Sequence, residues 1–160
     1  MKKVLNLVEE NMTEFPSVTS PKLPIKDAYE LMMKKGIRHL PVVVNEKVVG
    51  LVSQRDLTRA HGLSKSAGFT VEDVMSSEVY CVPVGTPLSV VTKEMALRKL
   101  GSAVILSTQG KVTGIFTTTD AMLILSKILA SNRGPEFRNW AVERLIDAGP
   151  FLETAAGLGI

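Results

Sequence analysis

The sequence has few of the residues that build metal, disulfide or nucleophilic sites. It contains one cysteine, Cys81, and two histidines in 160 residues. A single cysteine cannot form an internal disulfide, and so few separated cysteine and histidine residues do not match a zinc-binding pattern. The glycine-rich GxxxxGK[ST] loop of phosphoryl-transfer proteins is missing too. These absences fit a reducing compartment and favour a protein that is not an enzyme.

Long apolar runs and a dense charge of one sign are also missing. The longest clear apolar run is AMLIL at 121–125, far below the roughly 18 residues that indicate a membrane span. Polar residues interrupt the first ten positions, so they do not resemble a signal peptide. The net charge is only +3, and the basic residues are spread along the chain. We expect a cytoplasmic protein that binds no nucleic acid and does not span a membrane.

What the sequence does contain is an internal duplication. GLVSQRD at 50–56 returns as GIFTTTD at 114–120, a spacing of 64 residues. Met12, Pro24 and Met32 return as Met75, Pro87 and Met95 at a spacing of 63. The hydrophobic pattern keeps the same register, as expected for two copies of one supersecondary unit.

Each copy reads as strand, helix, strand, strand, helix. The first copy predicts a strand near 17–19, an amphipathic helix over 24–36, a hairpin of strands 40–44 and 47–53, and a short helix ending near residue 62. The second predicts a strand over 79–82, a helix over 87–101, strands over 102–107 and 111–117, and a helix over 120–131. Amphipathic helices are also expected over 4–12 and from 135 onward.

This order predicts an α+β (α/β) fold of two units, each β-α-β-β-α, packed about a pseudo-twofold axis with N- and C-terminal helices added. One such sheet is too small to bury both faces, so the copies should pair and leave two equivalent clefts between them. We place the first unit at 8–62, a linker rich in small residues at 63–70, the second unit at 71–131 and a helical tail at 132–160.

Four segments together resemble a known family. GIRHLPVVV, GLVSQRD, GSAVIL and GIFTTTD, in this order and duplicated, resemble a tandem pair of cystathionine β-synthase (CBS) domains, the Bateman module, as in stand-alone bacterial or archaeal CBS proteins. The resemblance covers about residues 8–130. It implies an adenosine ligand (AMP, ADP or ATP, with S-adenosylmethionine as another option) in the inter-repeat clefts, and no tightly bound cofactor. It also implies a homodimer, a flat disk of four units, that acts on an unknown effector protein.

The repeated heptapeptide has two interpretations. As a helix start, its hydroxyl and acid form a capping box: Ser53 or Thr117 accepts from a free backbone N–H, and Asp56 or Asp120 reaches back. As a binding motif, the carboxylate accepts from both hydroxyls of a ribose, and the helix start attracts a phosphate. The capping box leaves the glycine of the heptapeptide unexplained, whereas close approach of a backbone or ligand would explain it.

The candidate nucleotide-binding residues follow from the motif and the resemblance. The heptapeptides supply Ser53, Arg55, Asp56, Thr117, Thr119 and Asp120. Arg55 either binds a phosphate through its guanidinium group or is a solvated surface residue. The resemblance adds backbone contacts to a base near Thr19 and Val82, and phosphate contacts from Arg38, His39 and Lys99. Pro83 matches the proline that the family carries after this strand, whereas Ser20 departs from it.

We therefore expect a regulatory module that senses an adenosine nucleotide. The alternative is an interaction module whose clefts stay empty and which dimerises or docks onto an enzyme or transporter. A ligand that bridges two halves shifts their equilibrium by its difference in affinity between the states. Occupied clefts should therefore raise the melting temperature, and this separates the two interpretations.

Overall fold

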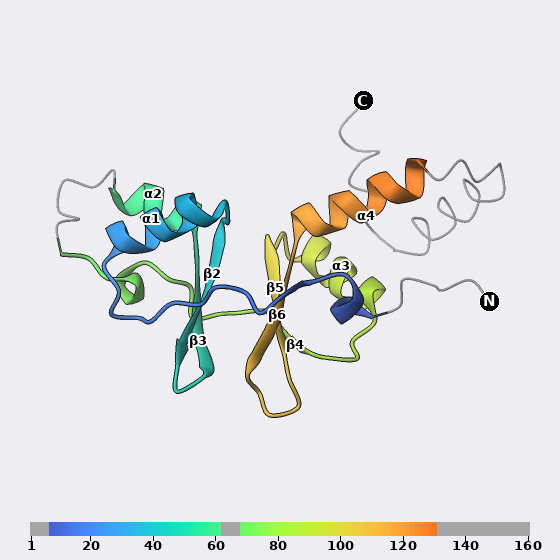
Figure 1. The fold of residues 1–160 in the computed structure, drawn as a ribbon, viewed down its shortest axis with the longest axis horizontal. Coiled ribbons are helices and arrows are strands. Elements are labelled where there is room, and N and C mark those ends of the chain that lie inside the picture. Colours follow the sequence, from blue (N-terminus) through green and yellow to red (C-terminus); the bar gives the residue numbers. More distant parts are fainter. Residues whose placement is uncertain (1–6, 62–67, 131–160) are drawn as a thin grey trace.

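Residues 7–61 and 68–130 are described by the computed structural model. In chain order the helices and strands are η1 (Val8–Glu10), β1 (Thr13–Glu14), α1 (Ile25–Lys35), β2 (His39–Val44), β3 (Lys47–Ser53), α2 (Gln54–His61), η2 (Val71–Asp73), β4 (Cys81–Pro83), α3 (Leu88–Leu97), β5 (Ser102–Leu106), β6 (Val112–Thr117) and α4 (Thr118–Ala130). The two units lie side by side (Figure 1), and each contains a hairpin and two α-helices. The predicted α+β fold of two related units is confirmed.

The helix and hairpin of the first copy end where the sequence predicts. Pro24 precedes α1, and Gly36 ends it with a left-handed φ of 63°, a conformation that glycine adopts at little cost. Asn45 and Glu46 both have positive φ in the two-residue turn between β2 and β3, as a type I′ hairpin requires. In the second copy, α3 ends at Leu97, earlier than expected, because Lys99 turns into the left-handed region.

The two copies use the same strand pairings. The second unit has a four-stranded sheet in the order β1-β6-β5-β4, in which β4 and β5 are parallel and the other pairs antiparallel. The first unit has the β2–β3 hairpin, extended by single bridges from Thr19 to Val42 and from Ser76 to Leu51. Both hairpins carry a β-bulge at corresponding residues, after Val42 and after Ile105. The predicted strand near 17–19 is thus reduced to the single bridge at Thr19.

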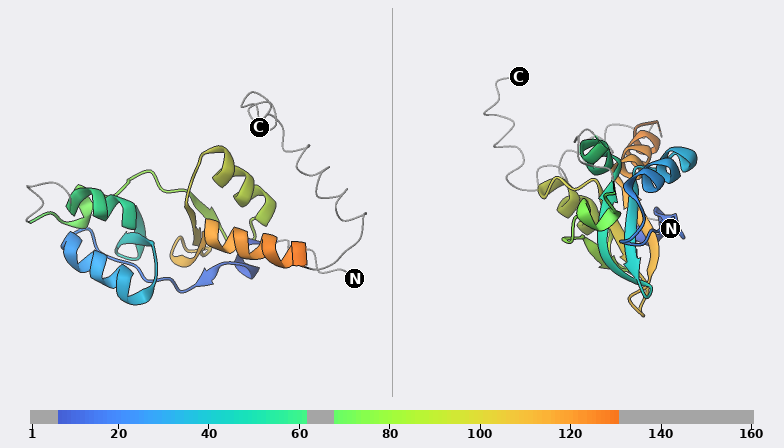
Figure 2. Two further views of the ribbon diagram at one scale, coloured as in Figure 1. Left: turned by 90° about the horizontal axis from the view of Figure 1, so that it is seen from above. Right: turned by 90° about the vertical axis from the view of Figure 1, so that its left-hand side faces the viewer.

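The first residues of each copy pack on the other copy. Val8 is buried in the core of the second unit, and β1 extends that unit's sheet. Val71 is buried in the core of the first unit, where Phe69 and Met75 pack beside it. Figure 2 shows the N-terminal segment leaving the second unit and running to the first. This exchange ties the two cores together.

The predicted N-terminal helix over 4–12 is wrong for the residues that the structure describes. Residues 8–10 form one turn of 3-10 helix, and Leu7 forms a bridge to Pro87. The backbone N–H of Val8 donates to the carbonyl of Thr86 at 3.0 Å. The segment therefore makes hydrogen bonds with the second unit instead of closing helical turns on itself. The predicted tail helix and the unit boundary at 131 lie outside the described residues.

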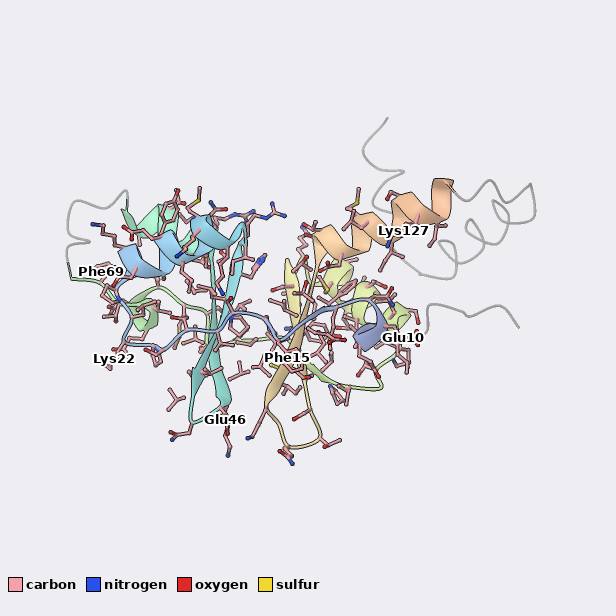
Figure 3. The ribbon with its side chains drawn as sticks, viewed as in Figure 1. Glu10, Phe15, Lys22, Glu46, Phe69 and Lys127 are labelled. Carbon is pink, nitrogen blue, oxygen red and sulfur yellow. The ribbon has the colours of Figure 1, made fainter. Side chains whose placement is uncertain are left out.

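The hairpin tips add a contact between the units at the far end from the helices. Lys111 Nζ lies 2.6 Å from Glu46 Oε2, and both side chains are exposed. Figure 3 shows Glu46 at the tip of the β2–β3 hairpin, beside the tip of the β5–β6 hairpin. An exposed ion pair of this kind adds little stability, so the exchanged segments hold the units together.

Candidate ligand cleft between the repeats

Both heptapeptides form the predicted capping box. Asp56 Oδ2 accepts from the backbone N–H and the hydroxyl of Ser53, at 2.9 and 2.6 Å. Asp120 Oδ2 accepts from the same two groups of Thr117, both at 2.7 Å. The N–H groups of the two aspartates approach the hydroxyls of Ser53 and Thr117 at 3.3 and 3.4 Å. The motif thus starts α2 and α4.

Capping uses only one oxygen of each carboxylate. Within the described part of the chain, Oδ1 of Asp56 and Oδ1 of Asp120 accept no hydrogen bond. A carboxylate oxygen has two lone pairs, so each Oδ1 can still accept from the hydroxyls of a diol. The two interpretations of the heptapeptide are therefore compatible. Only one carboxylate oxygen, instead of two, is left to accept hydrogen bonds from the sugar hydroxyls.

A cleft of about 1010 Å³ runs between the repeats at the start of α2. The first unit lines it with Ser53, Asp56 and other residues of β3 and α2, and the second unit with Tyr80, Lys99 and Ser102 among others. Its volume is in the range of pockets that hold small molecules and cofactors. The cleft therefore brings residues from both copies around the carboxylate of Asp56.

Six of the predicted site residues line this cleft: Arg38, His39, Ser53, Arg55, Asp56 and Lys99. The three from the second heptapeptide, Thr117, Thr119 and Asp120, do not line it. The residues that line this cleft differ from their repeat partners, as the sequence already indicates at Arg55. The partner of Lys99 is Gly36, for example, and the partner of Arg55 is Thr119.

Thr19 and Val82 are held in the sheets and are not among the residues that line the cleft. The N–H of Thr19 donates to Pro41 and its carbonyl accepts from Val43, both at 2.9 Å. Val82 lies in β4, with its side chain buried in the core of the second unit. The backbone groups that the resemblance assigns to a base are thus used at Thr19 by strand pairing.

The repeats meet beside the cleft. Arg38 Nη2 donates to Thr119 Oγ1 at 2.8 Å, from one unit to the other. The His39 ring packs so closely on Gly101 that a Cβ there would lie 2.9 Å from Nε2. Arg38 and His39 therefore join the units at the wall of the cleft, in addition to any contact with a ligand.

The surroundings of His39 favour its neutral form. Burial lowers the pKa of His39, and the charges of Arg38 and Arg55 act in the same direction, while Asp56 opposes them. A neutral imidazole offers one donor and one acceptor. The positive charge of this wall therefore comes from its arginine and lysine residues.

Sequence reasoning missed several polar residues of the cleft, among them Arg59, Tyr80 and Ser102. Tyr80 precedes β4, and the Arg98 guanidinium lies 5.4 Å from its ring centre. Ser102 occupies the position of His39 in the second copy, a correspondence that makes it a candidate. Arg59 follows Asp56 by three residues in α2, and this spacing puts both on one face of the helix.

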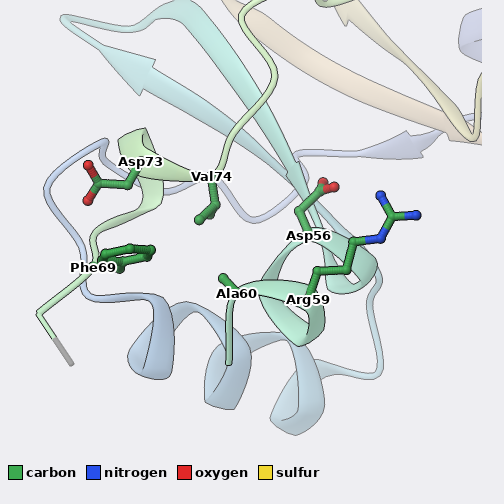
Figure 4. A pocket seen from close by; sticks show the side chains of 6 residues that line it. All are labelled: Asp56, Arg59, Ala60, Phe69, Asp73 and Val74. Carbon is green, nitrogen blue, oxygen red and sulfur yellow. The ribbon is translucent and has the colours of Figure 1, made fainter. Parts of the chain in front are cut away.

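A smaller pocket of about 250 Å³ opens on the other side of Asp56. Figure 4 shows Asp56 and Arg59 at one end of it, and Phe69 and Asp73 at the other. Asp73 caps η2 in the way that Asp56 caps α2, with Oδ2 accepting from the N–H and the hydroxyl of Thr70 at 2.8 and 3.0 Å. These two hydrogen bonds lower the pKa of Asp73. Asp73 therefore provides the same capping geometry outside the large cleft.

Residues 7–61 and 68–130 contain no group of three or more His, Cys, Asp or Glu side chains that could hold a metal ion. None of the helices in the same ranges is both long and apolar enough to cross a membrane.

Solved structures share this fold. AcuB of Vibrio cholerae matches with a TM-score of 0.70 and 29% identity, covering 82% of this chain and all of that one. CBSX2, a CBS-pair protein of Arabidopsis thaliana, was solved in complex with AMP. That complex matches with a TM-score of 0.68 and 27% identity, over 76% of this chain and 97% of that one.

Curated relatives match over one region of larger proteins. The inosine-5′-monophosphate dehydrogenase of Korarchaeum cryptofilum is 31% identical over 121 residues, which are 75% of this chain and 24% of that protein. The L-aspartate semialdehyde sulfurtransferase of Methanocaldococcus jannaschii is 26% identical over 121 residues, 75% of this chain and 23% of that protein. The chain thus spans about a quarter of the length of these relatives.

The family model described as "CBS domain" matches twice, at residues 7–62 and 71–127. The two matches cover more than half of the chain and coincide with the two copies of the duplication. Together with the fold of CBS-pair structures, they show that the chain belongs to the CBS domain family and carries a tandem pair of CBS domains.

Proposed function

We propose that this CBS pair is a regulatory module that binds an adenosine nucleotide in the cleft beside Asp56. The observation that carries the proposal is the cleft itself, because it joins an unpaired carboxylate oxygen, a helix start and cations from both repeats. The AMP complex of the similar protein CBSX2 supports an adenosine ligand. A ligand that touches both repeats favours the arrangement of units that it fits best.

In this proposal, Asp56 Oδ1 accepts from the ribose hydroxyls while Oδ2 keeps its capping bonds. The cations of the wall meet the phosphate. At the start of α2, the N–H groups of Gln54 and Asp56 already donate to the Arg38 carbonyl and the Ser53 hydroxyl, so the N–H of Arg55 is left to donate to the phosphate. Tyr80 offers an aromatic face to the base. The same chemistry at Asp120 would need a separate binding site, because Asp120 does not line this cleft.

Calorimetric titration of AMP, ADP and ATP tests the role of Asp56. Asp56→Ala should weaken binding about 10- to 150-fold, the equivalent of about 1.5–3 kcal/mol for lost charge-assisted hydrogen bonds. Asp73→Ala is the matched control, because it removes an identical capping carboxylate outside the cleft. It should leave the affinity unchanged. The 2′-deoxy nucleotides keep the 3′-hydroxyl, so they should bind wild type more weakly than the ribonucleotides do, but more tightly than the ribonucleotides bind Asp56→Ala.

Equal affinities of wild type and Asp56→Ala would refute the role of Asp56. If Asp120→Ala alone weakened binding, the ligand would lie at the second heptapeptide instead. Nucleotide turnover measured in the same samples would contradict the proposal that the module regulates and does not catalyse.

Association is the second candidate function. Exposed apolar side chains lie on α1 and α4, among them Met33 at 56% exposure and Met122 at 64%. Such surfaces favour contact with another protein, and we propose a homodimer as the first candidate. Light scattering should show a dimer for wild type and a monomer for Met122→Glu with Leu125→Glu. A ligand-free interaction module would show the dimer but no change of melting temperature with adenosine nucleotides.

A further inference from the structure

The geometry points to a cleft that selects an adenosine ligand with a chain of two or more phosphates over one that is uncharged or cationic. This inference rests on the proposed function and adds the chemical class of the ligand. It is carried by three observations: the charge of the wall, the difference between the two copies and a buried hydroxyl without a partner.

The wall of the cleft carries more positive than negative charge. Four cationic side chains line it, Arg38, Arg55, Arg59 and Lys99, against the two carboxylates Asp56 and Glu78. None of the four forms a salt bridge with another described residue. One carboxylate, Asp56, is assigned to the sugar. The remaining positive charge is available for an anionic group that extends beyond a single phosphate.

The duplication shows that these four cations are specific to this cleft. The positions of Arg55 and Arg59 are occupied by Thr119 and Leu123 in the second copy. The positions of Arg38 and Lys99 are occupied by glycines, Gly101 and Gly36. Since the backbone is the same in both copies, neither the fold nor the helix start requires these cations. The charge therefore belongs to the cleft of Asp56, and not to the CBS unit as such.

A buried hydroxyl marks a contact for the ligand in the same cleft. Ser102 lines the cleft, is only 5% exposed, and its Oγ has no hydrogen-bond partner among the described residues. An unpaired polar atom in the interior costs free energy that a partner would recover. Lys99 and Gly101, its near neighbours in the chain, line the cleft as well. A polar atom of the ligand would satisfy this hydroxyl.

A series of ligands tests the selection by charge. Adenosine, AMP, ADP, ATP and S-adenosylmethionine are titrated into the full chain by calorimetry at low and high salt. We expect the affinity to rise about tenfold from AMP to ADP or ATP, and to be lowest for adenosine and S-adenosylmethionine. The affinity for ADP and ATP should fall as the salt concentration rises. Arg55→Thr with Arg59→Leu introduces the residues of the second copy. This double variant should lose the preference for ATP, while its affinity for adenosine should stay within about twofold of the wild-type value. Lys93→Ala, an exposed cation that does not line the cleft, is the control.

Ser102→Ala distinguishes a ligand contact at Ser102 from a merely structural role. Removing an unpaired buried hydroxyl should keep or raise the melting temperature of the free protein, while it reduces the shift caused by ATP. A lower melting temperature without ligand would overturn the contact assigned to Ser102.

The outcomes separate the inference from the function on which it rests. If adenosine or S-adenosylmethionine binds as tightly as ATP, or if the double arginine variant keeps its preference for ATP, the selection is refuted and adenosine binding stands. If none of the five compounds binds wild type, both are refuted.

Discussion

At the scale of single residues, each heptapeptide glycine makes room for a methionine. A side chain at Gly50 would collide with Met75, and one at Gly114 with Met12. Met12 and Met75 are themselves repeat partners. Each methionine comes from the segment that crosses to the other unit. The close approach predicted for these glycines is therefore made by a packed side chain, and no ligand is needed to explain them.

Gly114→Ala should destabilise the fold. The added methyl group must displace Met12, and overpacking of this kind costs about 1–3 kcal/mol. Urea denaturation followed by circular dichroism measures the loss. Thr113→Ala in the same strand is the control, with an expected change within about 0.5 kcal/mol. If Gly114→Ala combined with Met12→Ala lost as much as the two single changes added together, the contact would not be the cause.

His39 should make stability depend on pH. Because burial and the arginine charges lower the pKa of His39 in the folded state below the ordinary value of 6.5, the unfolded state binds the proton more readily. The stabilising contribution is complete above about pH 6.5 and is lost as the pH falls through the folded pKa. Melting temperatures at pH 7.5 and 5.5 should differ more in wild type than in His39→Gln. Equal differences would remove His39 as the cause.

At the scale of elements, the hydroxyl and acid of the heptapeptide start a helix wherever they occur. The pair appears at Ser53, at Thr70 and at Thr117, each with its aspartate three residues on. Only the first lines the large cleft. The capping hydrogen bonds are thus a local property of the sequence. Whether a capping pair can also contact a ligand depends on where its helix lies in the fold.

Removing the cap of α4 should weaken the helix without changing the cleft. Thr117→Val keeps the shape of the side chain but loses the hydroxyl, and lost N-caps cost about 0.5–2 kcal/mol. The midpoint of urea denaturation should fall accordingly. Because Thr117 does not line the cleft, ATP affinity should stay as in wild type. A loss of affinity without a loss of stability would place Thr117 in a binding site.

At the scale of the whole molecule, the exchanged segments should make the two CBS units unfold together. Val8 and Val71 are both fully buried, each in the core of the unit that the other copy builds. A change in one core therefore loosens a segment that is covalently part of the other copy. We therefore expect the pair to unfold as one body and not as two independent domains.

Val71→Ala tests this coupling. Truncating a buried valine should cost about 1.5–3 kcal/mol, and hydrogen exchange should report the same loss of protection in β3 and in β6. Val8→Ala, in the opposite core, should give the same pattern. Protection lost in β3 alone after Val71→Ala would mean that the units unfold independently.

Much of the fold was predictable because its signals are local. Proline before α1, glycine after it, β-branched strands and a two-residue turn each act on their own neighbours. The capping pairs are equally local. The N-terminal segment was not predictable in this way, because its apolar spacing is compatible with a helix. Its hydrogen bonds to Thr86 and to β6 come from residues far along the chain.

The sequence by itself determined the duplication, the order of elements and the membership of the CBS family, because a repeated pattern with local caps and turns needs no distant partner to be recognised. Only the tertiary structure decided which acid faces the large cleft, that Ser102 and Arg59 lie beside it, and that methionines fill the space left by the glycines. The physical reason is that these contacts join residues of different copies. Their relative position depends on how the exchanged segments pack the two units together.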